Sequence, residues 1–170
     1  MVVSRHDCQA RLESKASVTA TIRRARADDL AALVPLVEQY LAFYDVKHPR
    51  SAVTRFVAQR LRAKPAFVWV AAQSRAATAE LIGFVQVYPS WSTLRLGPSW
   101  VLNDLYVEKQ ARGAGLGRAL VKIVVAEAER GGVRSVELMT ATTNAGARAL
   151  YESLGFQTDS TFLTYSIALP

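Results

Sequence analysis

The stretch QARGAGLGRAL, residues 110–120, is the most informative part of this sequence. Gly113, Gly115 and Gly117 alternate beside Arg112, and the chain then continues into an apolar segment with helical spacing. Backbone without Cβ atoms can approach an anion closely, and the first N–H groups of a helix point towards it. The stretch therefore predicts a loop that binds phosphate at the start of a helix.

Two common phosphate loops do not match this stretch. A dinucleotide fingerprint, G-x-G-x-x-G, would need glycine at position 118 or 120, where the chain has Arg118 and Leu120. A nucleotide P-loop needs a Gly-Lys pair, which does not follow these glycines. The pattern R-x-x-G-x-G fits Arg112, Gly115 and Gly117, and it has more glycines than a turn that only caps a helix requires. We expect the backbone N–H groups of residues 113–118 to face a pyrophosphate.

Composition sets the class of protein. With 170 residues, 51% hydrophobic and 21% charged, the chain is typical of one folded domain, which we place at 19–170 after a flexible polar tail at 1–18. No apolar run approaches the roughly 20 residues of a membrane span, and no secretory signal is recognisable, so we expect a cytoplasmic protein without membrane contact. Cys8 is the single cysteine and there are two histidines, so we expect no metal site.

A formal net charge of +7 suits an anionic partner. The basic residues are scattered, however, and no basic block with interleaved aromatic residues occurs. A nucleic-acid-binding domain is therefore supported by charge alone, and we do not expect nucleic acid as a partner.

Hydrophobic periodicity predicts an α/β (α+β) chain with a mixed sheet and helices packed on it. The expected elements are a strand at 19–25, helices at 30–41 and 51–63, strands at 66–73 and 80–90, a polar loop at 90–98, a strand at 99–107, a helix at 117–130, a strand at 133–140, a helix at 144–154 and a last strand at 161–169.

A second segment, NAGARALYESLGF at 144–156, strengthens the interpretation. Together, this segment and the glycine loop resemble the GNAT family of N-acetyltransferases, and the likeness to its Hpa-like and polyamine-type members is the greatest. The resemblance covers about Thr19 to Leu169. It implies the GNAT fold, a mixed and mostly antiparallel central sheet with helices on both faces, and acetyl-CoA (coenzyme A) as cosubstrate.

The resemblance also implies a site. Tyr151 would protonate the leaving thiolate, since a tyrosine hydroxyl keeps its proton at neutral pH; the alternative is an aromatic side chain that packs on the inner face of its helix. The cofactor-binding residues implied are Leu105, Tyr106, Val107, Arg112, Gly113, Ala114, Gly115, Leu116, Gly117, Arg118, Asn144 and Ala147.

The general base is left open. An amine with a pKa of about 10.4 must lose a proton before it can attack. Polyamine-type members carry Glu-Asp where this chain has Asn103 and Asp104, and an amide cannot act as a base. Strand alternation predicts that Asp104 faces away from Asn103, and a structural role for it is equally open. Glu38, Tyr44 and Asp45 could act through water.

The stretch YPSWSTLRLGPSW at 88–100 gives the hints about the acceptor amine. Tyr88, Trp91 and Trp100 resemble an aromatic stretch of the same members and would hold a cation or form a dimer contact. No carboxylate occurs between residues 86 and 103, which counts against spermidine.

We expect an N-acetyltransferase that acts on a small-molecule primary amine by direct attack in a ternary complex. The alternatives are a histone-like protein lysine acetyltransferase and a non-catalytic acyl-CoA-binding regulatory module. The resemblance implies a homodimer, with TFLTYSIAL at 161–169 as a possible contact.

Overall fold

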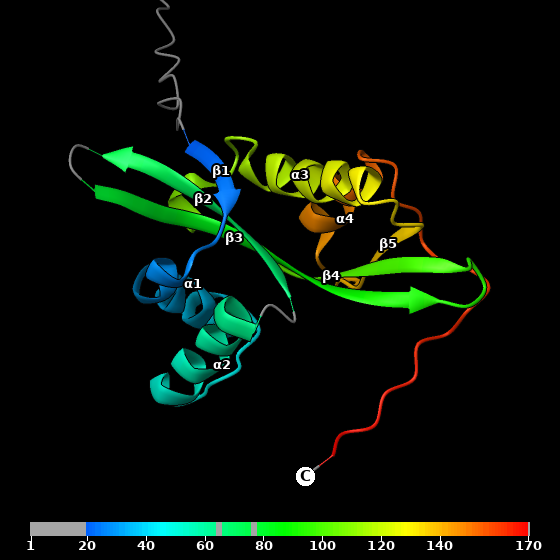
Figure 1. Cartoon of the computed structure of the whole chain (residues 1–170), viewed down its shortest axis with the longest axis horizontal. Coiled ribbons are helices and arrows are strands. Elements are labelled where there is room, and N and C mark those ends of the chain that lie inside the picture. The colour runs from blue at the N-terminus through cyan, green and yellow to red at the C-terminus, as the bar shows by residue number, and fades with distance from the viewer. Residues whose placement is uncertain (1–19, 64–65, 76–77, 170) are drawn as a thin grey trace, which may run out of the picture.

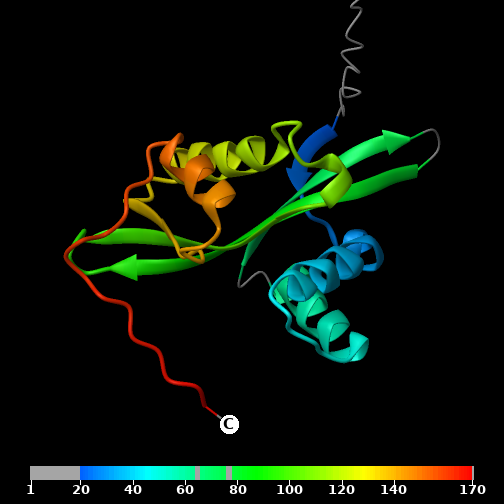
Figure 2. The ribbon, with the colours of Figure 1, turned by 180° about the vertical axis from the view of Figure 1, so that it is seen from behind.

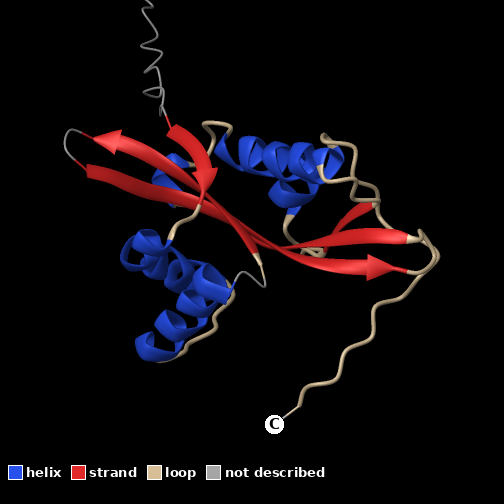
Figure 3. Cartoon of the chain, viewed as in Figure 1, coloured by secondary structure: helices blue, strands red, loops and turns tan. Residues whose placement is uncertain are grey.

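The computed structural model describes residues 20–63, 66–75 and 78–169. The tail expected at 1–18 lies outside these residues. The chain forms the following helices and strands (Figures 1 and 3): β1 Ala20–Arg24, α1 Leu30–Phe43, α2 Arg50–Ala63, β2 Phe67–Arg75, β3 Thr78–Ser92, β4 Gly97–Val107, α3 Leu116–Arg130, β5 Ser135–Leu138 and α4 Ala145–Glu152. Short 3₁₀ turns, Ala27–Asp29 and Lys109–Ala111, precede α1 and the glycine loop.

The strands form one five-stranded sheet in the order β1-β2-β3-β4-β5. Neighbours from β1 to β4 are antiparallel, whereas β5 is parallel to β4. A parallel neighbour requires a crossover, and α3 provides it between β4 and β5. The sheet is thus mixed and mostly antiparallel, as the sequence predicts.

Helices cover both faces of the sheet, α1 and α2 on one side and α3 and α4 on the other (Figures 1 and 2). Successive side chains of β2 point to opposite faces of the sheet, so this strand contributes to the hydrophobic core on each face. Val68 and Val70 pack against α1 and α2, whereas Trp69 and Ala71 pack against α3. All four side chains are buried, which explains why this strand is apolar from Phe67 to Ala72.

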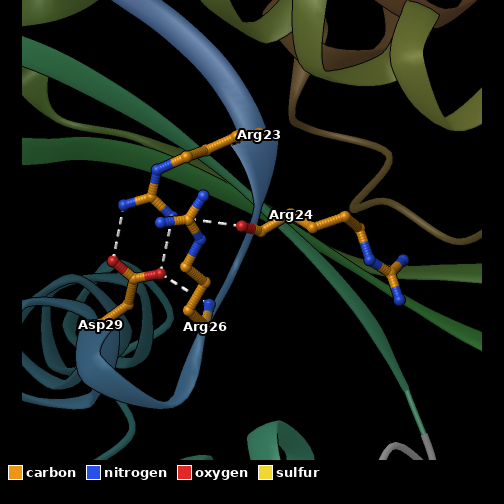
Figure 4. Close-up of polar contacts among 4 residues, drawn as sticks. All are labelled: Arg23, Arg24, Arg26 and Asp29. Atoms are coloured by element: carbon orange, nitrogen blue, oxygen red, sulfur yellow. Dashed lines mark hydrogen bonds and ion pairs between the residues drawn. The ribbon is translucent and has the colours of Figure 1, made fainter.

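An ion pair holds the start of α1 against the sheet (Figure 4). Arg23 on β1 donates two hydrogen bonds of 2.7 Å to the Asp29 carboxylate, which also accepts one from the backbone N–H of Arg26 at 2.7 Å. These hydrogen bonds hold the pKa of Asp29 below its ordinary value. Arg24 points the other way, with its guanidinium 4.6 Å from the ring centroid of Phe67 and 4.4 Å from that of Trp69.

Two sequence expectations are wrong. The loop expected at 90–98 is mostly strand, because β3 runs to Ser92 and β4 begins at Gly97, and cross-strand pairing continues to the end of this hairpin. The last strand expected at 161–169 is absent: this segment pairs with no strand in the described part of the chain and leaves the body of the molecule as an extended arm (Figure 1, red). A strand forms only where a neighbouring edge supplies its hydrogen bonds.

Two irregularities of β4 shape the site. The register of β3 and β4 shifts, so that Gln86 is opposite Asp104 and Val87 is opposite Leu102, which leaves Asn103 as an extra residue in a β-bulge. On its other side, β4 pairs with β5 through Ser99 to Leu102 and no further. The two parallel strands therefore separate at the same place where the bulge occurs.

Candidate acetyl-CoA and acceptor site

A cleft of about 560 Å³ opens where β4 and β5 separate. Its walls are the second half of β4, the glycine loop with the start of α3, and α4, and Tyr40, Phe43 and Tyr44 of the α1 segment add to them. Every cofactor-binding residue expected from the sequence lines the cleft except Ala114, and Tyr151 lines it as well. Segments from residue 102 to residue 151 thus meet in one place.

The glycine loop has the geometry of an anion cradle. Gly113 and Gly115 have φ angles of 81° and 80°, a region that favours glycine. A Cβ atom at Gly115 would meet no heavy atom within 4 Å, so the space beside this backbone is open. The first helical hydrogen bond runs from the Ala119 N–H to the Gly115 carbonyl at 3.0 Å, so the N–H groups before Ala119 have no helical acceptor. These groups and the helix dipole fit a pyrophosphate.

The edge of β4 beside the loop is open. From Asp104 to Val107 the strand pairs with β3 alone, because its pairing with β5 stops at Leu102. Alternate backbone N–H and C=O groups of an edge strand face away from the sheet, and here they face the cleft. An extended ligand that carries amide groups, such as a pantetheine arm, can pair with this edge as an added strand does.

Two arginines fix the loop to its surroundings. Arg112 Nε donates to the Val107 carbonyl at 2.9 Å, and its guanidinium lies 5.5 Å from the ring centroid of Tyr106. Arg118 donates to Ser153 Oγ at 2.6 Å, which ties the start of α3 to the end of α4. Both side chains line the cleft, so their charges favour a polyanionic ligand there.

Tyr151 lies on the inner side of α4, where it borders both the cleft and the core. Its side chain is 8% exposed, and its ring makes an edge contact with Phe156 at a centroid distance of 5.8 Å. Burial, helped by nearby Tyr44, raises the pKa of the Tyr151 hydroxyl to about 12. The hydroxyl therefore keeps its proton at neutral pH and can donate it. Packing and proton donation are compatible in this position.

Asn144 has a structural task that the sequence motif did not indicate. Its Oδ1 accepts a hydrogen bond from the Ala147 N–H at 3.2 Å, so it is the N-cap of α4. Since α4 carries Tyr151, the cap also helps to place the tyrosine hydroxyl in the cleft.

A second cavity, of about 340 Å³, lies between α1, α2 and the adjoining face of β3 and β4. Tyr40 and Asn103 line both this cavity and the cleft, so the two spaces adjoin. Sequence reasoning missed Tyr40, His48 and Gln86, which also line the second cavity. They belong to no shared motif, and only the packing of α1 and α2 on the sheet brings them together.

The expectation that Asp104 and Asn103 face opposite ways is wrong. The Asn103 amide donates to Asp104 Oδ2 at 3.1 Å, and both side chains line the second cavity. The β-bulge breaks the alternation: Leu102 packs in the core on the α3 side, whereas Tyr106, an even number of residues later, packs on the α1 side.

The three aromatic residues expected to bind the acceptor, Tyr88, Trp91 and Trp100, lie apart from one another. Trp100 is buried against Phe67, at a ring-centroid distance of 5.0 Å, in the core on the α3 side. Trp91 is 80% exposed, and neither it nor Tyr88 lines either cavity, so the three aromatic residues do not form one acceptor site.

Of the three side chains that could act as a base through water, one lies at the site. Tyr44 lines the cleft, whereas Asp45 lines neither cavity. Glu38 also lines neither cavity, and it pairs with Arg50 at 2.7 Å on the surface.

Within the described part of the chain, no group of three or more His, Cys, Asp or Glu side chains is placed to hold a metal ion. The helices of that part are also too short or too polar to cross a bilayer.

Comparisons with known proteins agree with this geometry. The family described as "Acetyltransferase (GNAT) family" matches residues 33–156. The chain is 33% identical over 149 residues to the uncharacterized N-acetyltransferase YhfO of Bacillus subtilis (strain 168), which covers 88% of this chain and 97% of that protein. It is 30% identical over 125 residues to the D-amino-acid N-acetyltransferase HPA3 of Saccharomyces cerevisiae, which covers 73% of this chain and 76% of that protein. The crystal structure of a probable acetyltransferase superposes with a TM-score of 0.80 at 30% identity and covers 88% of this chain and 98% of that one.

Proposed function

The chain belongs to the GNAT family of acetyltransferases, and we propose that it moves the acetyl group of acetyl-CoA to a small-molecule primary amine by direct attack in a ternary complex. Enzymes of this family depend on acetyl-CoA. The observation that carries the proposal is the separation of β4 from β5 beside the glycine loop, which leaves an open strand edge and a set of helix N–H groups along one cleft.

Each part of the cleft has a separate task in this proposal. The loop N–H groups bind the pyrophosphate, and Arg112 and Arg118 add positive charge beside it. The open edge at Leu105, Tyr106 and Val107 aligns the pantetheine arm, and a backbone N–H of this edge polarises the thioester carbonyl. Acetyl-CoA supplies an acetyl group activated as a thioester.

Transfer needs an amine without its extra proton and a donor for the departing sulfur. The nitrogen lone pair forms the new C–N bond while the C–S bond breaks, and the thiolate takes the proton of the Tyr151 hydroxyl. The proton lost by the amine nitrogen then restores the tyrosine. Because burial keeps Tyr151 protonated, the donor is ready at neutral pH.

The experiment that tests the function is acetyl-CoA turnover, detected as free thiol, with a panel of monoamines, polyamines, aminoglycosides, D- and L-amino acids and lysine peptides. Release of thiol that depends on an added amine supports acetyl transfer. Tight binding of acetyl-CoA by calorimetry, without turnover on any amine, would instead indicate a regulatory acyl-CoA-binding module. Turnover on lysine peptides alone would indicate a protein acetyltransferase.

The C-terminal arm supports a homodimer as a further part of the proposal. Leu163, Tyr165, Ile167 and Leu169 alternate along it, and all four side chains are exposed. Such a segment can add a strand to a partner sheet, and β5 is an edge strand, since β4 is its one neighbour in the sheet order. A single domain over 19–170 and a cytoplasmic location stay predictions from the sequence.

A further inference from the structure

The second cavity has the size and walls of a small-ligand site. Its volume of about 340 Å³ lies at the lower end of the range of roughly 300–1,000 Å³ that is usual for such sites. Val37 and Leu41 of α1, Val53 and Phe56 of α2, and Phe84 of β3 give it apolar walls. These walls suit a ligand with an apolar body rather than a polyhydroxylated one.

One acidic group faces this apolar space. Among the described lining residues, Asp104 is the only carboxylate, and no lysine or arginine occurs. Tyr40 and His48 are the other titratable groups of the lining, and burial, together with the negative charge of Asp104, raises the pKa of the Tyr40 hydroxyl. A single ammonium group would therefore find a partner here, whereas a ligand carboxylate would lose water without gaining a cation.

Asp104 is held in place by its neighbours. Gln86, a buried residue of β3, donates from Nε2 to Asp104 Oδ2 at 2.9 Å and to the Tyr88 hydroxyl at 2.9 Å. Arg60 of α2 donates to the same hydroxyl at 3.2 Å. Gln86 and Asn103 donate to the same oxygen, Oδ2, so Oδ1 receives no hydrogen bond from either amide. The Tyr40 hydroxyl also forms a side-chain hydrogen bond with Asp104. A carboxylate has about four acceptor positions, so a fixed carboxylate with these three donors still has room for an ammonium ligand.

The cavity adjoins the cleft that holds Tyr151. Tyr40 and Asn103 line both spaces, and Asn103 is the bulge residue directly before Asp104. An amine held by Asp104 would thus sit at the boundary between the two spaces, beside the open edge of β4. That is where a nucleophile for the acetyl group must be placed.

The geometry points to an acceptor that is a primary monoamine with an apolar body of about the size of an aromatic ring and no carboxylate, its ammonium group bound by Asp104. This inference rests on the proposed function and narrows its acceptor. It disfavours polyamines as acceptors, because their second cation has no partner among the described lining residues. It also disfavours amino acids, because these residues include no lysine or arginine to pair with the carboxylate of the ligand. Asp104 acts by binding and orienting the ammonium group, which then loses its proton to water.

Two matched pairs of amines test the acceptor class. Phenethylamine and D- or L-phenylalanine differ by the carboxylate, and hexylamine and 1,6-diaminohexane differ by the second amine. We expect kcat/KM to be at least roughly tenfold higher for phenethylamine and for hexylamine than for their partners, which is the effect of one unpaired buried charge. Equal or reversed values in either pair would overturn the inference.

Replacement of the Asp104 carboxylate tests whether this residue binds the acceptor. Asp104→Asn should lower kcat/KM for phenethylamine by roughly 10- to 100-fold, chiefly through KM, because a charged hydrogen bond is lost. Affinity for coenzyme A, measured by calorimetry, should stay unchanged. Asp28→Asn is the matched control: Asp28 is an exposed carboxylate before α1 that lines neither cavity, and its loss should leave KM unchanged.

A direct binding measurement separates this inference from the proposed function. Phenethylamine is titrated into the enzyme with coenzyme A bound, and we expect binding that Asp104→Asn weakens by the same factor. Binding without any turnover would leave the cavity assignment in place and remove the proposed function. Turnover on D-amino acids or lysine peptides, with no binding of phenethylamine, would leave acetyl transfer in place and overturn the acceptor class.

A gain of charge gives a second, independent variant. His48 is exposed and lines the cavity, so His48→Arg would place a cation at its edge without disturbing the core. In this variant, the ratio of kcat/KM for phenethylamine to that for D-phenylalanine should fall by at least roughly fivefold, because the carboxylate of the amino acid then has a partner. An unchanged preference would contradict the explanation that amino acids are disfavoured for want of a cation.

Discussion

The side-chain amide of Asn103 donates a hydrogen bond of 3.1 Å to the carboxylate of Asp104, its neighbour in the sequence. In a regular strand, successive side chains point to opposite faces and cannot meet in this way. The β-bulge at Asn103 removes this restriction and turns Asp104 towards α1 and α2. Bulges often re-aim side chains beside active sites, and here the bulge places a carboxylate where the two cavities adjoin.

A second carboxylate at the bulge should change the choice of acceptor. Asn103→Glu would place two like charges next to each other, and repulsion should raise the pKa of one of them. We expect the ratio of kcat/KM for 1,6-diaminohexane to that for hexylamine to rise at least roughly tenfold, since a second cation then has a partner. Asn103→Gln is the control with the same length and no charge. A ratio that is the same in both variants would show that charge at this position does not select the acceptor.

The proton-donor role of Tyr151 is tested by removal of its hydroxyl. Tyr151→Phe should lower kcat by about 100-fold, which is typical for loss of a general acid, and should change the dissociation constant of acetyl-CoA by less than about twofold. Stability should hardly change, because the ring keeps its contact with Phe156. Single-turnover kinetics and calorimetry measure the two quantities. Equal losses of rate and affinity would indicate that Tyr151 binds the cofactor rather than donates a proton.

The raised pKa of Tyr151 predicts the shape of the pH profile. A group that must be protonated stops working as the pH rises through its pKa, and for Tyr151 that value is about 12. The kcat of the wild type should therefore show no alkaline fall that depends on Tyr151 between about pH 7 and pH 10. The measurement is kcat against pH for the wild type and for Tyr151→Phe. An alkaline fall near pH 9 that is present in the wild type and absent in the variant would contradict this assignment.

The open space at Gly115 predicts the effect of a large side chain. Gly115→Trp should abolish coenzyme A binding, because its side chain would fill the anion cradle beside the loop N–H groups. Gly132→Trp is a matched control at the other end of α3: its φ is also positive, at 68°, and no heavy atom lies within 4 Å of its Cβ position. Both variants carry a similar backbone strain of about 1–2 kcal/mol. Calorimetry that finds coenzyme A affinity unchanged at Gly115→Trp would refute the loop assignment.

The ion pair at the start of α1 predicts how stability depends on acid. Asp29 has a lowered pKa in the folded chain, so its stabilisation is present above its unfolded pKa of about 3.9 and is lost as the pH falls through the folded value. Asp29→Asn should lower the free energy of unfolding by about 2 kcal/mol at neutral pH, since it breaks the hydrogen bonds with Arg23. Urea unfolding at several pH values measures the difference, which should shrink below about pH 4. A difference independent of pH would show that the charge of Asp29 is not its source.

The exposed C-terminal arm predicts the oligomeric state. The full chain should sediment as a dimer, and a chain that ends at Gln157 should sediment as a monomer, because the apolar residues of the arm need a partner edge. Ile167→Asp, on the apolar face of the arm, should weaken the dimer, whereas Ser166→Asp, on the other face, should not. A monomeric full chain would refute the dimer.

The sequence by itself determined the family, the mixed sheet with helices packed on it and the position of the glycine loop at the start of α3. These depend on local chemistry: glycines with positive φ at Gly113 and Gly115, helical periodicity in α3 and α4, and alternation in β1. Each of these patterns specifies its structure within a few residues of chain, which is why they can be recognised before the fold is known.

Only the tertiary structure decided which residues line the second cavity. Gln86, His48 and Tyr40 come from three distant segments, and no spacing in the sequence relates them to Asp104. The orientation of Asp104 depends on the register between β3 and β4, because one extra residue reverses which face a side chain occupies. The segment at 161–169 shows the same dependence: its alternation is typical of a strand, but no edge within residues 20–63, 66–75 and 78–169 pairs with it. Strand pairing and cavity contents are properties of contacts between distant segments, and the sequence pattern of any one segment does not contain them.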